Sequence, residues 1–287
     1  SAPSWFVKVV RLLSGCVQRP TIEGRRWIAM RRCLIALTAV GVLAFAACGG
    51  SDEADDATAG EITESTWDVV ILADSYLANV AEPYAEHVAE ANDVDVVLHN
   101  EYTHLLPVKS LAEVLAADAS VGGWPELVSD AEVVVYFANP LGLIPEGQEE
   151  NCGNGGARIM ESHCDGDWDP YREGLEQIAV EIKRLRDGQP TIIRTIQGYS
   201  PGVGSWEEAG VYDDCLACDA YAREAEQAAA DAQGVPIAQV WDEFNGPDHT
   251  EDPVEKGYIA SDGFHPSLEG AQVIADLLHD LGYETTP

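Results

Sequence analysis

Short, continuous runs of apolar residues, many of them β-branched, recur along the chain from about residue 66 onward. They occupy residues 69–72, 94–98, 133–137, 191–196 and 236–240. Runs of this length without polar alternation are typical of strands that are buried on both faces of a sheet. The pattern therefore predicts five buried strands.

Between these runs, apolar residues recur at three- and four-residue spacing, which predicts helices. Asp169-Pro170 is a helix-start signal, Gly188 follows the end of the same stretch, and Ser267 is placed as the N-cap of the last helix. The predicted helices cover residues 76–92, 110–117, 169–187, 213–233 and 267–281. Strands that alternate with helices predict an α/β fold of three layers, α/β/α, with a five-stranded parallel sheet in one domain over 66–287.

Polar residues that could take part in catalysis follow three of the predicted strands. Ser75 comes just after the first strand, Asn139 follows the third, and Asp262 and His265 follow the fifth. In open parallel sheets, ligands bind beyond the carboxyl ends of the strands. We therefore expect these residues to meet at one edge of the sheet.

This combination of side chains suits the hydrolysis of an unactivated ester. A serine hydroxyl is a weak nucleophile at neutral pH, so His265 would accept the proton of Ser75 and return it to the leaving alcohol. Asp262, three residues before the histidine, would bind the other ring nitrogen and fix the tautomer. The predicted catalytic residues are Ser75, His265 and Asp262, and the reaction needs no cofactor and no metal.

The same residues resemble the sequence blocks of the SGNH hydrolase family, also called GDSL esterases and lipases, over about residues 66–283. Ala73-Asp74-Ser75 is similar to the Gly-Asp-Ser block, Asp262-Gly263-Phe264-His265 matches Asp-X-X-His, and Asn139 matches the asparagine of a third block. The resemblance implies a flavodoxin-like fold and a serine esterase that forms an acyl-enzyme at Ser75. It also implies an oxyanion hole that includes the backbone N–H of Ser75 and the side chain of Asn139, with Asp74 bracing the turn.

The chain departs from the family pattern at four places. Ala73 replaces a glycine, Phe137 and Pro140 replace the glycine and the aspartate of the block that contains Asn139, and residues 100–104 contain no equivalent of the glycine in the second block. In the family, the backbone N–H of the second-block glycine is a further donor of the oxyanion hole. The sequence does not identify the residue that takes its place here. These departures suggest one alternative, a ligand-binding lipoprotein whose catalytic site has decayed. A second alternative is an acyltransferase on the same scaffold that acts on cell-envelope sugars.

The first 65 residues predict export rather than a folded domain. Residues 30–47 have a basic start, a short apolar stretch and small residues before Cys48, which resembles a bacterial lipoprotein signal with lipidation at Cys48. A plain secretory signal or a short membrane anchor is the alternative. Residues 1–29 are interpreted as upstream sequence, and residues 48–65 as a flexible acidic linker.

Charge narrows the range of partners. The chain carries a formal charge of −34; seven basic residues and one glutamate lie within residues 1–47, so residues 48–287 carry −40. Such a surface disfavours nucleic acid and anionic membranes. It predicts either a highly soluble exterior or adaptation to high salt. We expect a monomer that acts on a small-molecule or polysaccharide ester, with the lipid anchor as its contact with a membrane.

Four cysteines belong to the predicted domain: Cys152, Cys164, Cys215 and Cys218. Exported proteins meet an oxidising compartment, so disulfides are expected, and the spacing favours Cys152–Cys164 and Cys215–Cys218. The other pairings stay open. A four-cysteine zinc site, with His163 as a substitute ligand, and a redox-active Cys-X-X-Cys are weaker alternatives.

Overall fold

The computed structural model describes residues 62, 65–103, 106–140 and 168–287. The predictions for residues 1–29 and 30–47, for Cys48 and for most of the linker lie outside the described residues. So do Cys152, Cys164 and His163.

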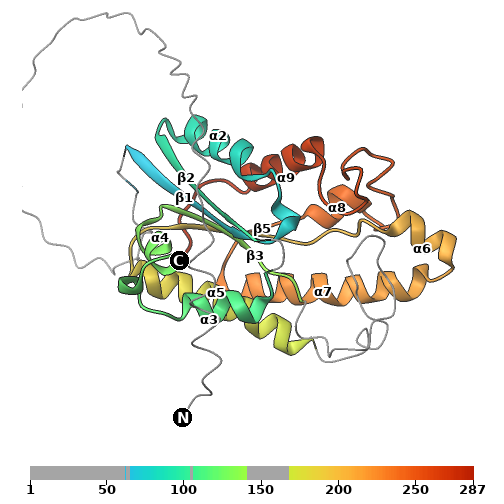
Figure 1. Cartoon of the computed structure of the whole chain (residues 1–287), viewed down its shortest axis with the longest axis horizontal. Coiled ribbons are helices and arrows are strands. Elements are labelled where there is room, and N and C mark those ends of the chain that lie inside the picture. The colour runs from blue at the N-terminus through green and yellow to red at the C-terminus, as the bar shows by residue number, and fades with distance from the viewer. Residues whose placement is uncertain (1–61, 63–64, 104–105, 141–167) are drawn as a thin grey trace, which may run out of the picture. The chain divides into compact units, whose positions relative to one another are not determined.

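Within the described residues, five parallel strands form one sheet in the order β2-β1-β3-β4-β5 (Figure 1). They are β1 (Thr66–Ala73), β2 (Asp95–Tyr102), β3 (Val133–Phe137), β4 (Ile192–Ile196) and β5 (Ile237–Ala238). The predicted five-stranded parallel sheet is confirmed. The strand order reverses between β1 and β3, and the crevice at such a switch point is where doubly wound sheets bind ligands.

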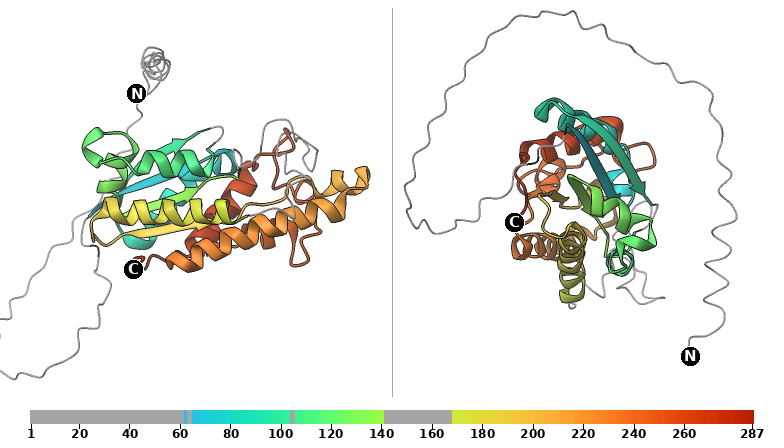
Figure 2. Two further views of the ribbon diagram at one scale, coloured as in Figure 1. Left: turned by 90° about the horizontal axis from the view of Figure 1, so that it is seen from below. Right: turned by 90° about the vertical axis from the view of Figure 1, so that its left-hand side faces the viewer.

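Helices cover both faces of the sheet (Figures 1 and 2). One layer holds α2 (Ala81–Asn92) and α9 (Leu268–Asp280), which contact each other, and the other holds α3 (Val108–Leu115), α5 (Asp169–Arg186) and α7 (Tyr212–Gln233). Shorter helical elements are η1 (Ser75–Leu77), η2 (Ala119–Val121), α4 (Trp124–Asp130), α6 (Val203–Ala209) and α8 (Val240–Asn245). The predicted three-layer α/β/α architecture is thus confirmed.

The alternation of side chains along each strand divides the core into two parts. Val69 and Ile71 of β1 pack in a cluster with residues of α2 and α9. Val70 and Leu72 pack in a second cluster with residues of α3, α5 and α7. Because both faces of β1 and β3 are buried, these two strands read as continuous apolar runs in the sequence, whereas β2 lies at the edge of the sheet and is only partly buried.

Two predicted elements differ most clearly from the structure, and β2 also continues to Tyr102, four residues beyond its predicted end at residue 98. The stretch 76–92 is not one helix: Asp74 caps the short η1, Asn79 adopts a positive φ of 63°, and α2 starts only at Ala81. The predicted strand 236–240 is reduced to Ile237–Ala238 because the chain turns into α8 at Val240. The predicted N-cap at Ser267 is confirmed, since its side chain accepts a hydrogen bond from the Gly270 N–H.

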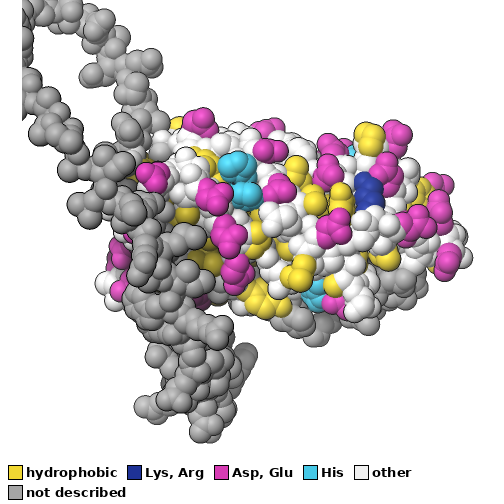
Figure 3. All heavy atoms as spheres, turned by 90° about the horizontal axis from the view of Figure 1, so that it is seen from above, with side chains coloured by type: hydrophobic (Ala, Val, Ile, Leu, Met, Phe, Trp, Pro, Cys, Tyr) yellow, Lys and Arg dark blue, Asp and Glu magenta, His cyan; other side chains and the backbone are white. Residues whose placement is uncertain are grey.

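Acidic side chains are spread over the face that carries α2 and α9, with few basic ones among them (Figure 3). Carboxylates distributed in this way remain solvated and repel one another only weakly at physiological salt. In the described part of the chain, none of the helices has the length and apolar character required to span a bilayer.

Candidate active site

Ser75 lies in the tight turn that follows β1. The side chain of Asp74 accepts a hydrogen bond of 2.9 Å from the Tyr76 N–H, so Asp74 is the N-cap of η1 and Ser75 is its first residue. Ser75 is buried, at the carboxyl end of the strand. A capped 3₁₀ turn fixes the backbone on both sides of the serine.

Asn139 lies two residues beyond β3, the strand next to β1. Its backbone is held on both sides by the segment after β2: the Asn139 N–H donates to Leu106 O (3.1 Å), and the Val108 N–H donates to Asn139 O (3.1 Å). Asn139 also forms a parallel bridge with Pro107, as an extended residue does. Its amide Nδ2 donates a hydrogen bond to Asp74 Oδ2. The structure thus brings Asn139 beside the Asp74-Ser75 turn.

The carboxyl group of Asp74 is almost completely buried between these two partners. Burial raises its pKa to about 7, although the Tyr76 N–H, the Asn139 amide and the nearby His265 ring oppose the shift. Asp74 makes the bracing contacts that the family resemblance implied.

Asp262 and His265 form a pair within one short loop. His265 Nδ1 lies 2.8 Å from Asp262 Oδ2, and Asp262 Oδ1 accepts hydrogen bonds from the N–H groups of Phe264 (2.9 Å) and His265 (3.0 Å). Partial burial raises the pKa of Asp262, but these hydrogen bonds outweigh it and lower the pKa to about 2. Asp262 is therefore a carboxylate at neutral pH, and it selects the tautomer that carries its proton on Nδ1 and leaves Nε2 basic.

Aromatic rings join this loop to the serine turn. The ring of Tyr76, next to Ser75, packs edge-on against the ring of Phe264, next to His265, with centroids 5.2 Å apart. Tyr76 also contacts Tyr199, which follows β4, at 4.6 Å. The residues predicted to act together thus lie in one region of the molecule, although they come from positions as distant as 75 and 265.

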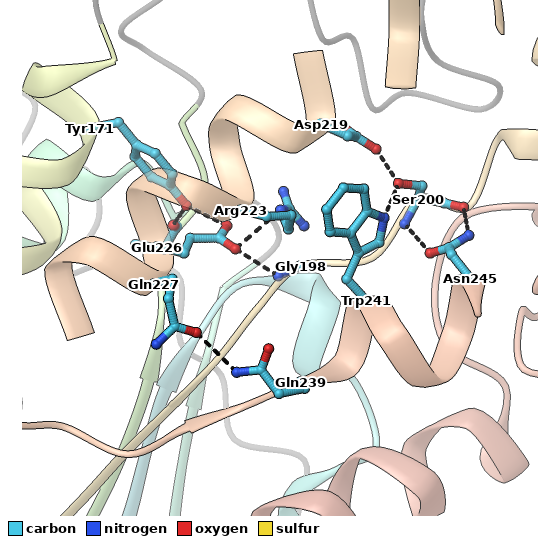
Figure 4. A network of polar contacts seen from close by, with 11 residues as sticks. Tyr171, Gly198, Ser200, Asp219, Arg223, Glu226, Gln227, Gln239, Trp241 and Asn245 are labelled. Atoms are coloured by element: carbon cyan, nitrogen blue, oxygen red, sulfur yellow. Dashed lines mark hydrogen bonds and ion pairs between the residues drawn. The ribbon is translucent and has the colours of Figure 1, made fainter. Parts of the chain in front are cut away.

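A buried polar network beside this region was not predicted from the sequence (Figure 4). Glu226 of α7 forms an ion pair with Arg223 (3.1 Å), accepts a hydrogen bond from the Gly198 N–H (3.0 Å) and lies 3.0 Å from the Tyr171 hydroxyl. The same hydroxyl lies 2.9 Å from the carbonyl oxygen of Ala138, the residue before Asn139. Helix α7 therefore supports both the loop after β4 and the turn after β3.

The network continues from α7 to α8. Asp219 accepts a hydrogen bond from the Ser200 hydroxyl, which in turn accepts one from Trp241 Nε1 (3.0 Å), and Asn245 binds both the N–H and the carbonyl of Ser200 at 2.9 Å. Burial raises the pKa values of Asp219 and Glu226, and Arg223 opposes the shift in both. The spacing of Asp219, Arg223 and Glu226 by four and three residues places them on one face of the helix. This spacing is the feature of the sequence that could have indicated the network.

An open groove of about 900 Å³ adjoins the loop that carries the Asp262–His265 pair. Its walls come from α6 and from the segment 250–256, and Gly263 reaches its edge. Five of the lining residues are acidic and one is a lysine: Glu207, Glu208, Glu251, Asp252, Glu255 and Lys256. Ser75 and Asn139 are not among the residues that line this groove.

Cys215 and Cys218 lie one turn apart on α7; both are buried and disulfide-bonded. Their pairing stays a prediction, because the other two cysteines lie outside the described residues. Among the described residues, no group of three His, Cys, Asp or Glu side chains is arranged to hold a metal ion.

No protein-family model matches the chain, and no curated protein matches it. Among solved structures, the chain is similar to the lipase Lip_vut3 from a goat rumen metagenome, with a TM-score of 0.56 and 16% sequence identity over 76% of this chain and 98% of the lipase. This likeness shows the fold.

Two further structures score lower. The esterase EstA from Pseudoalteromonas sp. has a TM-score of 0.45 and 11% identity, covering 76% of this chain and 96% of EstA. An acetyl xylan esterase, AlAXEase, has a TM-score of 0.44 and 14% identity, covering 73% of this chain and 96% of the esterase.

Proposed function

We propose that the protein is a serine ester hydrolase of the SGNH type that cleaves short acyl or acetyl esters. The observation that carries this proposal is the Asp262–His265 pair, joined through packed aromatic rings to the turn that holds Ser75 beside Asn139. The fold shared with a lipase agrees with it.

In the proposed reaction, Ser75 Oγ attacks the ester carbonyl carbon while His265 Nε2 takes the hydroxyl proton. The carbonyl oxygen becomes an oxyanion, which the Ser75 N–H and the Asn139 amide stabilise. The C–O bond to the alcohol then breaks, and the alcohol leaves with the proton from His265. A water molecule, deprotonated by the same nitrogen, releases the carboxylic acid and restores Ser75.

Asp74 has a separate part in this scheme. An amide nitrogen carries two hydrogens, and the bond to Asp74 uses one of them and fixes the plane of the Asn139 amide. Asp262 carries the negative charge that stabilises the imidazolium formed during each proton transfer, since its low pKa keeps it ionised.

The test is hydrolysis of p-nitrophenyl acetate and butyrate by the purified chain, beside Ser75→Ala and His265→Ala. We expect both variants to lose at least about 10³-fold in kcat, because the nucleophile and the base act as one unit. Equal rates in the three proteins, after subtraction of the spontaneous reaction, would refute the proposal. Asn139→Ala should lose about 10²–10³-fold, as expected for one oxyanion donor.

The proposal includes export with a lipid on Cys48 and disulfide bonds among Cys152, Cys164, Cys215 and Cys218. The support is the sequence pattern before Cys48 and the burial of the last two cysteines. Mass spectrometry of protein expressed in a bacterium tests both points, since acylation adds mass at Cys48 and each disulfide removes two hydrogens. Unmodified Cys48 behind an intact signal would refute lipidation.

A further inference from the structure

Tyr199 occupies a position between the two halves of the proposed site. It lies three residues beyond β4, in the loop that α7 supports, and it is 1% exposed. Its ring packs against Tyr76 at 4.6 Å and against Phe244 of α8 at 4.7 Å. The side chain is therefore held in place by two neighbouring rings.

The hydroxyl of Tyr199 donates a hydrogen bond of 3.1 Å to the carbonyl oxygen of Phe264. That carbonyl belongs to the peptide group whose N–H is the N–H of His265. Because a peptide group is planar, fixing its oxygen also fixes the orientation of the following N–H and Cα. The bond thus restrains the position of the His265 Cα, from which the side chain leaves the backbone.

The opposite side of the same peptide group is held by Asp262, whose Oδ1 accepts the His265 N–H at 3.0 Å. Asp262 belongs to the loop itself, so this contact gives the loop its shape without locating it on the sheet. Tyr199, three residues beyond the end of β4, connects the loop to that edge of the sheet. Its ring contact with Tyr76 relates the position of the loop to the turn that carries Ser75.

We infer that Tyr199 is a positioning residue that holds His265 in reach of Ser75 through the Phe264 carbonyl. This inference rests on the proposed function. Tyr199 does not touch the reacting atoms in this scheme, and its effect passes through the histidine. Burial, with nearby Tyr76 and two acidic groups, raises the pKa of Tyr199 well above its usual value, so the hydroxyl keeps its proton and remains a donor throughout the assay range.

The test is Tyr199→Phe, which removes the hydroxyl and keeps the ring. We expect kcat to fall about tenfold with KM unchanged, because misplacing a catalytic group by 1 Å can cost on the order of a hundredfold. The rate of labelling by a serine-reactive phosphonate should fall by the same factor, since that reaction also needs the base.

Tyr84→Phe is the matched control. Tyr84 of α2 is as deeply buried as Tyr199, and among the described residues its hydroxyl has no hydrogen-bond partner. Removing it should leave kcat unchanged and the midpoint of thermal unfolding equal or higher, because an unpaired buried hydroxyl is unfavourable.

A double-mutant cycle separates positioning from general stability. If Tyr199 acts through His265, Tyr199→Phe should cause no further loss of labelling rate in the His265→Ala background. The same proportional loss in both backgrounds would overturn the inference. So would a kcat within twofold of wild type in Tyr199→Phe while Ser75→Ala is inactive, a result that leaves the proposed function intact.

A spectroscopic readout covers the case in which the wild type hydrolyses no ester and the proposed function itself fails. The Nδ1 proton of His265, bound to Asp262, can be followed by NMR of histidine-labelled protein and assigned with His265→Ala. We expect its resonance to shift or broaden in Tyr199→Phe and to stay in place in Tyr84→Phe. An unchanged resonance in Tyr199→Phe would overturn the inference whatever the activity.

Discussion

Two buried arginines near opposite ends of β4 have different partners. Arg194, within the strand, donates hydrogen bonds to the carbonyl oxygens of Ile193 (2.8 Å), Gly282 (2.8 Å) and Glu284 (3.0 Å). Arg223 of α7, beside Gly198 at the other end, forms an ion pair with Glu226 and is close enough to Asp219 to influence its pKa. One guanidinium is surrounded by neutral dipoles and the other by carboxylates.

The difference corresponds to different structural roles of the two arginines at the two ends of the strand. Near the start of β4, Arg194 fastens the segment 282–286 to the sheet, where the Thr286 N–H donates to Thr191 O (2.8 Å). Near the end, the charge of Arg223 lets acidic groups remain buried next to the proposed active site. Burial lowers the pKa of Arg194, whereas Glu226 and Asp219 outweigh burial and raise that of Arg223.

Gly198 makes the second arrangement sterically feasible. A Cβ at this position would lie 1.9 Å from Arg223 Nη1, so any larger residue would displace the guanidinium. The Nε and Nη1 atoms of Arg223 have no hydrogen-bond partner among the described residues. Its contribution is therefore mainly electrostatic, whereas that of Arg194 comes from directed hydrogen bonds.

The largest expected effect comes from Arg223→Met, which removes the cation and leaves Glu226 and Asp219 buried. Breaking a buried ion pair in this way typically costs about 3–5 kcal/mol of unfolding free energy. The pKa values of both acids should rise further, so the folded state takes up protons more readily than the unfolded state between about pH 4 and these raised values. The loss should therefore be larger at pH 8 than at pH 5 in urea unfolding. A loss that is independent of pH would contradict the electrostatic role.

Arg194→Met should have a smaller effect, about 1–3 kcal/mol, from carbonyl groups left without donors. The carbonyl partners of Arg194 do not titrate, so urea unfolding should give the same loss at pH 5 and pH 8. Hydrogen exchange at the N–H of Thr286 should become faster in the variant, because this residue lies in the segment that Arg194 fastens. A loss with the same pH dependence as in Arg223→Met would erase the contrast between the two arginines.

The smallest change in stability at pH 5 is expected for Asp74→Asn, about 1 kcal/mol, since asparagine and aspartate cap helices about equally well and the Asn139 amide can turn to present its oxygen to the new NH2 group. Its effect lies in the pH dependence. The pKa of Asp74 is about 7 when folded and 3.8 in its reference state, so the folded wild type holds an extra proton between these values. The contribution of Asp74 to wild-type stability must therefore fall as pH rises through this window. The asparagine of the variant does not titrate, so this pH-dependent contribution should be absent from Asp74→Asn. Parallel stability curves for the two proteins from pH 5 to pH 8 would show that the shift is absent.

The sheet was predictable because its strands contain short apolar runs, which are continuous in β1 and β3, where both faces are buried. The edge strand β2 is only partly buried, and its polar second half was not predicted as strand. The strand order could not be predicted, since all the apolar runs look alike. The edge of the sheet on which Ser75, Asn139 and His265 lie could be predicted, because each of these residues follows a strand. Helices α4, α6 and α8 were missed because each has only six or seven residues, too few to show a periodic pattern.

The supporting network was harder to see in the sequence. Arg223 and Glu226 stand in an alanine-rich helix, where charged residues usually indicate a solvent face. Tyr199 gave no signal, because a tyrosine after a strand reads as core packing. Roles that depend on what a backbone carbonyl contacts, such as that of Phe264, have no signature in residue type.

The attachment of segment 282–286 to β4 has a consequence for the order in which the protein can fold. Arg194 and Thr286 are 92 residues apart in the chain, yet the edge of β4 next to its start is closed by Thr286. A ribosome adds residues one at a time, and earlier parts of a chain collapse first. The start of β4 therefore stays uncovered along one edge until residues 282–286 have been synthesised. A chaperone that binds the nascent chain would find this strand edge exposed.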